Sequence, residues 1–208
     1  MTPTRTASES AGEAALQEAE ALLQAGLAAS RQDDSERALH FFARASAANP
    51  SGAMPHFLIG SEFAALGQMD KAEAELANAV LLAPGLHLAR YQLGLLQFSA
   101  GRAAVALVTW APLLALGDGQ ALAQYVQGLA ALAQDDFSRA RTHFESGLAL
   151  PQENPAVAVD IRKVLAGMEV ALTKNARQEA NTSSVQAAPE APTSHVLVSN
   201  YGKFGSLH

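Results

Sequence analysis

The stretch from Lys71 to Pro84, KAEAELANAVLLAP, alternates small and large residues at helical spacing. Ala72, Leu76 and Ala79 follow one another at offsets of four and three, and the proline ends the run five residues later. Upstream lie a large–small pair, a further large residue and a helix-breaking glycine, which are Ile59, Gly60, Phe63 and Gly67. These sizes and breaks predict a hairpin of two helices, in which large side chains fill the space left by small ones.

The same pattern returns every 34 residues without an insertion, with starts at residues 19, 53, 87 and 121. The eighth position of each repeat is glycine, the twentieth is alanine and the twenty-fourth is large. The residues at these positions are Gly26, Gly60, Gly94 and Gly128; Ala38, Ala72, Ala106 and Ala140; Phe42, Leu76, Trp110 and Phe144. Since glycine inside a helix costs up to about 1 kcal/mol, four glycines at one phase indicate close approach of two backbones.

This pattern resembles the tetratricopeptide repeat (TPR) family, whose period is also 34 residues. The third repeat departs most from the family pattern, because Leu113 replaces a small residue, Asp118 replaces the final proline and Pro112 falls inside the second helix. The resemblance covers residues 19–154. It implies an all-α fold, a right-handed TPR superhelical solenoid of four helix-turn-helix repeats.

The chain is expected to divide into an N-terminal segment, the repeats, a capping helix and a tail. Residues 1–18 hold the N-terminal tail and the start of the first helix, where Ser10 and Glu13 predict a capping box. Residues 155–179 predict an amphipathic helix that covers the last repeat. The Pro- and Ser-rich residues 180–208 predict a disordered, flexible tail with an apolar end segment. The repeats themselves occupy residues 19–52, 53–86, 87–120 and 121–154.

Composition excludes several classes of function. The net charge of −6 gives no electrostatic footprint for nucleic acid. The absence of cysteine removes disulfides, thiolate metal sites and a cysteine nucleophile together. No window approaches the ~20 apolar residues of a membrane span, and the start of the chain does not read as a secretory signal. The expected location is therefore cytoplasmic.

No catalytic, cofactor or metal signature stands out, so we expect a protein that is not an enzyme and binds no cofactor. Paired carboxylates occur at Asp33-Asp34 and Asp135-Asp136, but both pairs lie at hairpin turns, where helix capping explains them. The histidines fall at unrelated phases of the repeat and show no paired ligand spacing; they are His40, His56, His87, His143, His195 and His208.

The repeat offers a surface instead. In the TPR family, positions two, five, nine and twelve of each first helix line the concave face, and the resemblance implies the same here. From the second repeat onward these positions are almost wholly apolar, and they lack the Lys, Arg and Asn with which family members grip a C-terminal carboxylate. The predicted partner-binding groove consists of Met54, Phe57, Leu88, Tyr91, Leu95, Phe98, Leu122, Tyr125, Leu129 and Leu132.

An apolar groove of this size is expected to be covered by other apolar groups, and three interpretations remain open. It binds an apolar helix or extended peptide of a partner, it packs against neighbouring helices, or the chain's own tail folds back onto it. The tail carries a second candidate docking segment, whose apolar residues are Val196, Leu197, Val198, Tyr201 and Phe204.

The sequence therefore predicts a non-enzymatic adaptor or chaperone that holds an apolar segment of a protein partner in the concave groove. One alternative is a structural or assembly subunit of a secretion or envelope complex that docks through its C-terminal tail. Another is a regulatory subunit of an enzyme. A homodimer is compatible with all three.

Overall fold

The computed structural model describes residues 7–182, and within them all regular secondary structure is helical, as predicted. The chain divides inside α5, between Leu96 and Gln97, into two units that are described separately. The helices are α1 (Ala7–Ser30), α2 (Ser35–Ala48), α3 (Ala53–Ala65), α4 (Met69–Leu82), α5 (His87–Ser99), α6 (Ala103–Leu114), α7 (Ala121–Leu132), α8 (Phe137–Ala149) and α9 (Pro155–Thr182).

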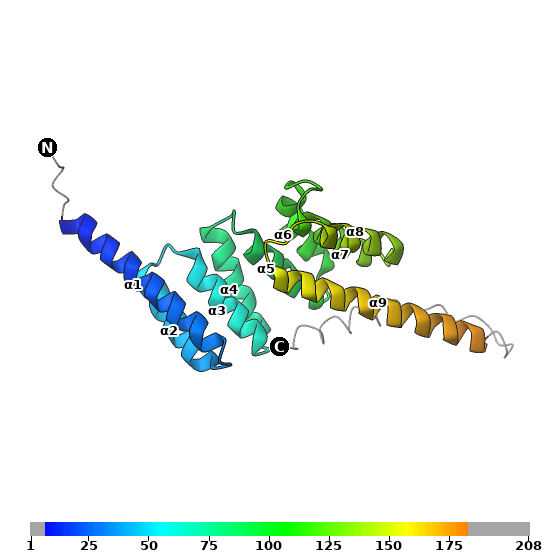
Figure 1. Ribbon diagram of the computed structural model, residues 1–208, viewed down its shortest axis with the longest axis horizontal. Coiled ribbons are helices and arrows are strands. Elements are labelled where there is room, and N and C mark those ends of the chain that lie inside the picture. Colours follow the sequence, from blue (N-terminus) through cyan, green and yellow to red (C-terminus); the bar gives the residue numbers. More distant parts are fainter. Residues whose placement is uncertain (1–6, 183–208) are drawn as a thin grey trace. The chain divides into compact units, whose positions relative to one another are not determined.

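The first unit contains the hairpins α1–α2 and α3–α4, whose helices lie side by side in Figure 1. Phe42 of α2 is buried, and a Cβ atom added at Gly26 of α1 would overlap its ring. In the second hairpin a Cβ at Gly60 would lie 2.8 Å from Leu76 Cγ. The predicted close approach of eighth and twenty-fourth positions is thus confirmed in both hairpins.

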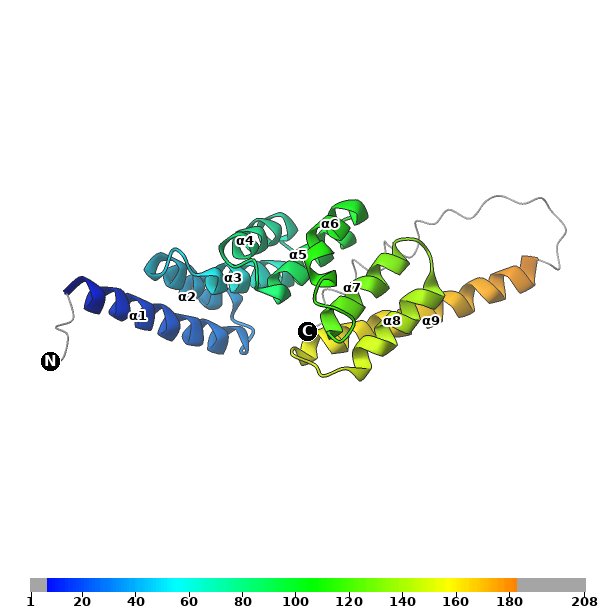
Figure 2. The same cartoon turned by 90° about the horizontal axis from the view of Figure 1, so that it is seen from above.

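The second unit contains α6, α7, α8 and α9, and successive helices contact one another. A Cβ at Gly128 of α7 would overlap the buried ring of Phe144 on α8, which repeats the packing of the first unit. Figure 2 shows α9 beside α8, and an ion pair of 3.1 Å joins Arg141 Nη1 to Glu169 Oε1. The apolar residues that α9 buries are Val157, Ala158, Ile161, Val164 and Met168.

The hairpin turns take the geometry that their residues predict. The backbone enters the left-handed region at the fifteenth repeat position, with φ of 57° at Asp33, 72° at Gly67, 76° at Gly101 and 56° at Asp135. The aspartate after each Asp turn residue caps the next helix: Asp34 accepts a hydrogen bond from Arg37 N (3.1 Å), and Asp136 accepts one from Arg139 N (3.0 Å).

Two helix ends differ from the sequence prediction. α1 begins at Ala7, so Ser10 and Glu13 lie inside the helix and do not form its capping box. α9 continues to Thr182, three residues beyond the predicted end at residue 179. The added residues are mostly alanine and polar residues without Gly or Pro, so no strong breaker stops either helix earlier. Pro112 lies inside α6, two residues before its end at Leu114, where the disruption is confined to the last turn.

Candidate protein-binding surfaces

Half of the predicted groove is not accessible to a partner. Tyr91 and Tyr125 expose only 2% and 1% of their surfaces, and Phe57, Phe98 and Leu129 are also buried. These five predicted groove residues are therefore buried within the chain, and partner binding by the groove stays a prediction. Of the other five, Met54 is 43% exposed, and four side chains are partly buried: Leu88, Leu95, Leu122 and Leu132.

Among the buried groove residues, Tyr125 fills space that a small neighbour leaves open. A Cβ at Gly147 of α8 would lie 2.6 Å from the Tyr125 ring, so that ring occupies the position of an absent side chain. The Tyr125 hydroxyl donates a 2.7 Å hydrogen bond to Gln152 Oε1. Burial raises the pKa of the Tyr125 phenol, and the Gln152 hydrogen bond and the Arg162 charge offset this only in part. Phe98 packs against Trp110, with ring centroids 5.9 Å apart.

An uncharged exposed stripe lies on α6 of the second unit. Val108 is 75% exposed and Val105 is 46% exposed. Ala104, Ala111 and Pro112 are also exposed, and this spacing puts all five on one side of the helix. We call these five residues the α6 face. The opposite side of α6 is buried through Ala106, Trp110 and Leu113.

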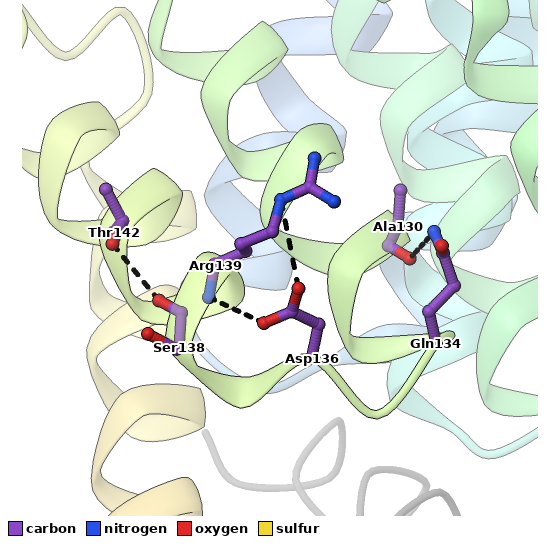
Figure 3. A network of polar contacts seen from close by, with 6 residues as sticks. All are labelled: Ala130, Gln134, Asp136, Ser138, Arg139 and Thr142. Atoms are coloured by element: carbon purple, nitrogen blue, oxygen red, sulfur yellow. Dashed lines mark hydrogen bonds and ion pairs between the residues drawn. The ribbon is translucent and has the colours of Figure 1, made fainter.

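The equivalent positions of the other second helices are more polar, although they are also exposed. At the phase of Val105, the other three repeats carry Arg37, Lys71 and Arg139. At the phase of Pro112 they carry Arg44, Asn78 and Ser146. Figure 3 shows part of this polar surface on α8, where Arg139 lies beside Asp136, and Thr142, at the phase of Val108, bonds to the Ser138 carbonyl.

Pro112 changes the backbone of the α6 face as well as its side chains. Because proline has no N–H, the Val108 carbonyl lacks the donor that residue i+4 supplies elsewhere in a helix. A bound segment could satisfy this carbonyl with its own N–H group.

A pocket of about 270 Å³ adjoins the C-terminal end of α6 at Leu114. Its wall continues through Ala130 and Ala131 of α7, and its polar groups come from Gln127 and Gln134 of α7 and from Arg139 and His143 of α8. This volume lies below the ~300–1,000 Å³ typical of small-molecule sites. The pocket suits one or two side chains of a peptide better than a complete metabolite.

Arg139, the charged residue of the pocket, makes only a weak ion pair within the chain. Arg139 Nε lies 3.8 Å from Asp136 Oδ2, and the Arg139 side chain is 69% exposed. Exposed pairs of this length contribute little to stability, so the guanidinium can take another carboxylate at low cost. His143 Nδ1 lies 3.0 Å from Gln124 Oε1, which fixes the orientation of its ring.

A polar cluster in the first unit is centred on His56. Its Nδ1 lies 2.6 Å from Glu75 Oε2, and its Nε2 lies 3.4 Å from Ser46 Oγ. The order Ser–His–Glu is that of a hydrolytic triad, but 3.4 Å exceeds the ~2.6–3.2 Å of a nucleophile–base hydrogen bond. The three residues belong to α2, α3 and α4, and we assign the cluster a structural role in joining these helices.

The remaining predictions concern metals, membranes and the tail. Within residues 7–182, no group of three or more His, Asp or Glu side chains is arranged to hold a metal ion. None of the helices in that range combines the length and apolar composition of a membrane-spanning segment. The candidate docking residues of the tail lie outside the described residues; they are Val196, Leu197, Val198, Tyr201 and Phe204.

Comparison with known proteins supports the fold. A crystal structure of MamA matches with 22% sequence identity and a TM-score of 0.53, over 62% of this chain and 76% of that chain. A structure of MamA from residue 41 to its end, from Desulfovibrio magneticus RS-1, matches with 18% identity and a TM-score of 0.56, over 81% and 93% of the two chains. The chain has an all-α, TPR-like fold. No protein-family model and no curated protein matches its sequence at a significant level.

The sequence analysis missed the α6 face, although the signal is present. Residues 103–117, AAVALVTWAPLLALG, contain no charged residue. A helix that is apolar on all sides is typical of a fully buried element, so the exposure of Val108 could be recognised only in the structure.

Proposed function

We propose that this chain is a non-catalytic, TPR-type interaction scaffold, an adaptor or chaperone that binds an apolar segment of a protein partner on the α6 face. The observation that carries the proposal is the exposed stripe around Val108; the other repeats carry polar or charged residues at most of the five equivalent positions. Contiguous exposed apolar patches of more than a few hundred Å² mark interaction sites, so the α6 face would form one part of such a site. Helical repeats also present extended surfaces that suit this use.

The α6 face and the adjoining pocket together define the chemistry of the partner. An amphipathic helix or extended peptide would lay apolar side chains against Val105, Val108 and Pro112 and place one anchor beside Leu114. An acidic side chain next to that anchor would pair with Arg139 at the rim of the pocket. Most of the affinity would come from apolar burial, so we expect binding to depend little on salt.

Capture of partners from native lysate by the full-length chain tests this function. The variants are Val108→Lys on α6 and Thr142→Lys at the same repeat phase on α8; both positions are exposed, so both proteins should fold. We expect Val108→Lys to lose the partner by at least tenfold and Thr142→Lys to retain it. Retention by both variants, or equal loss by both, contradicts the assignment of the α6 face.

A further inference from the structure

The α6 face is too small to hold a free partner of high affinity by itself. A 12-residue helix is about 18 Å long and presents a side about 10 Å wide, which is roughly 200 Å². A stable interface buries about 800 Å² on each partner. The α6 face therefore suits either the centre of a larger interface or a ligand that is tethered to the same chain.

Residues 196–204, VLVSNYGKF, have the composition of such a tethered ligand. They contain no acidic residue and one base, Lys203, so almost no charge would lose its water on binding an uncharged surface. Val196, Leu197, Val198, Tyr201 and Phe204 offer aliphatic and aromatic groups in one short run. A backbone N–H of this run could also bond the Val108 carbonyl that Pro112 leaves without its helical donor.

The chain is long enough for this contact. The Arg141–Glu169 ion pair marks a point at which α9 lies beside α8, and 13 residues of α9, about 20 Å, continue from there to Thr182. Three helix spacings of 8–10 Å separate α9 from α6 through α8 and α7. The straight path is roughly 35 Å. The 13 residues from 183 to 195 reach ~43–47 Å when extended.

We propose that residues 196–204 bind the α6 face of the same chain and so compete with a protein partner for it. The inference rests on the proposed function of that face. A short tether gives an effective concentration in the millimolar range, which compensates for a contact too small to bind from solution. A partner with a longer apolar segment, or with a carboxylate for Arg139, displaces the segment because it also fills the pocket.

Disulfide trapping in the full chain tests this directly, because the natural sequence has no cysteine. The test variant carries Val108→Cys and Ser199→Cys; the control carries Thr142→Cys and Ser199→Cys. A disulfide requires Cα atoms within about 4.4–6.8 Å, so it reports contact. Under mild oxidation we expect a monomeric disulfide to form at least tenfold faster in the test variant than in the control. Replacing Val198 and Tyr201 by Lys should abolish the difference.

Two outcomes overturn the inference. Equal trapping rates in test and control mean that residues 196–204 do not select the α6 face. Rapid disulfide-linked dimers of the single variant Val108→Cys mean that a second copy covers it. Neither outcome decides the proposed function, which is judged by the partner capture of Val108→Lys and Thr142→Lys; trapping without any partner loss in Val108→Lys would instead refute that function alone.

Discussion

The helices α6 and α8 share their buried faces but differ on their exposed ones. Ala106 and Trp110 of α6 are fully buried, as are Ala140 and Phe144 of α8, at the same repeat phases. On the outer sides, Val108 stands where α8 carries Thr142. Packing within the fold explains why the buried faces of α6 and α8 are alike. It does not explain why their exposed faces differ. Under the proposed function, this difference reflects a partner that binds the α6 face from outside.

The first test compares how substitutions on the buried and the exposed face of α6 change the free energy of unfolding. Trp110→Ala empties a fully buried site and should cost about 3–5 kcal/mol of unfolding free energy. Val108→Thr on the exposed face should change it by no more than about 0.5 kcal/mol. Urea unfolding followed by circular dichroism gives both values. A large loss for Val108→Thr would show that the α6 face is part of the core.

A second test concerns the glycine that lets α7 approach α8. Gly128→Ala would place a methyl group in the Phe144 ring and should destabilise the second unit by about 1–3 kcal/mol. Gly-to-Ala changes inside helices are otherwise stabilising. The sign of the change in unfolding free energy therefore shows whether the methyl group meets the Phe144 ring. Fluorescence of Trp110, the single tryptophan, reports unfolding of this unit. The control is Gly119→Ala, where a Cβ meets no atom within 4 Å and stability should hold.

A smaller effect is expected at the start of α8. Asp136→Ala removes the carboxylate that accepts a hydrogen bond from Arg139 N and should cost about 1 kcal/mol. Ser138→Ala, an exposed change within the first turn of the same helix, should be neutral or slightly stabilising. Chemical denaturation of the two variants side by side measures the difference. If both behave alike, Asp136 is not a functional cap.

The last prediction is confined to alkaline pH. Because the pKa of Tyr125 is raised in the folded chain, the unfolded chain loses its phenolic proton first, near pH 10. The contribution of the Tyr125 phenol to the unfolding free energy is therefore fully present below pH 10. It is lost as the pH rises toward the folded-state pKa. Tyr125→Phe should be slightly less stable at neutral pH, since Gln152 loses its donor, and should show a shallower decline above pH 10. An equally steep decline would contradict the raised pKa.

Much of the hairpin packing could be predicted from the sequence because residue size carries it. Gly128 and Phe144 are read as partners from their phases alone, and the structure places them in contact. The role of Tyr125 could not be predicted in this way. A helical stripe shows which residues share a side, but burial of that side depends on the neighbour, and Gly147 leaves the room that the Tyr125 ring fills.

Contacts between polar residues on different helices escaped the sequence analysis for a related reason. His56 and Glu75 lie at the fourth and twenty-third repeat positions, and Gln124 and His143, which also contact each other, lie at the same two positions two repeats later. The two pairs differ in residue type, so no repeated residue marks this contact in the sequence. The α6 face escaped because its lack of charge is also typical of buried helices. Exposure depends on the assembled fold. Only the structure shows that Val108 is exposed while Trp110 on the same helix is buried.

Photo-crosslinking in the native cell tests the central claim most directly. A benzophenone side chain placed at position 108 of the full-length chain samples the α6 face, and the same group at position 142 samples the equivalent face of α8. We predict that position 108 yields a specific protein adduct, or an intramolecular adduct with residues 196–204, and that position 142 yields neither. Adducts of equal yield from both positions, or none from position 108, would contradict the account.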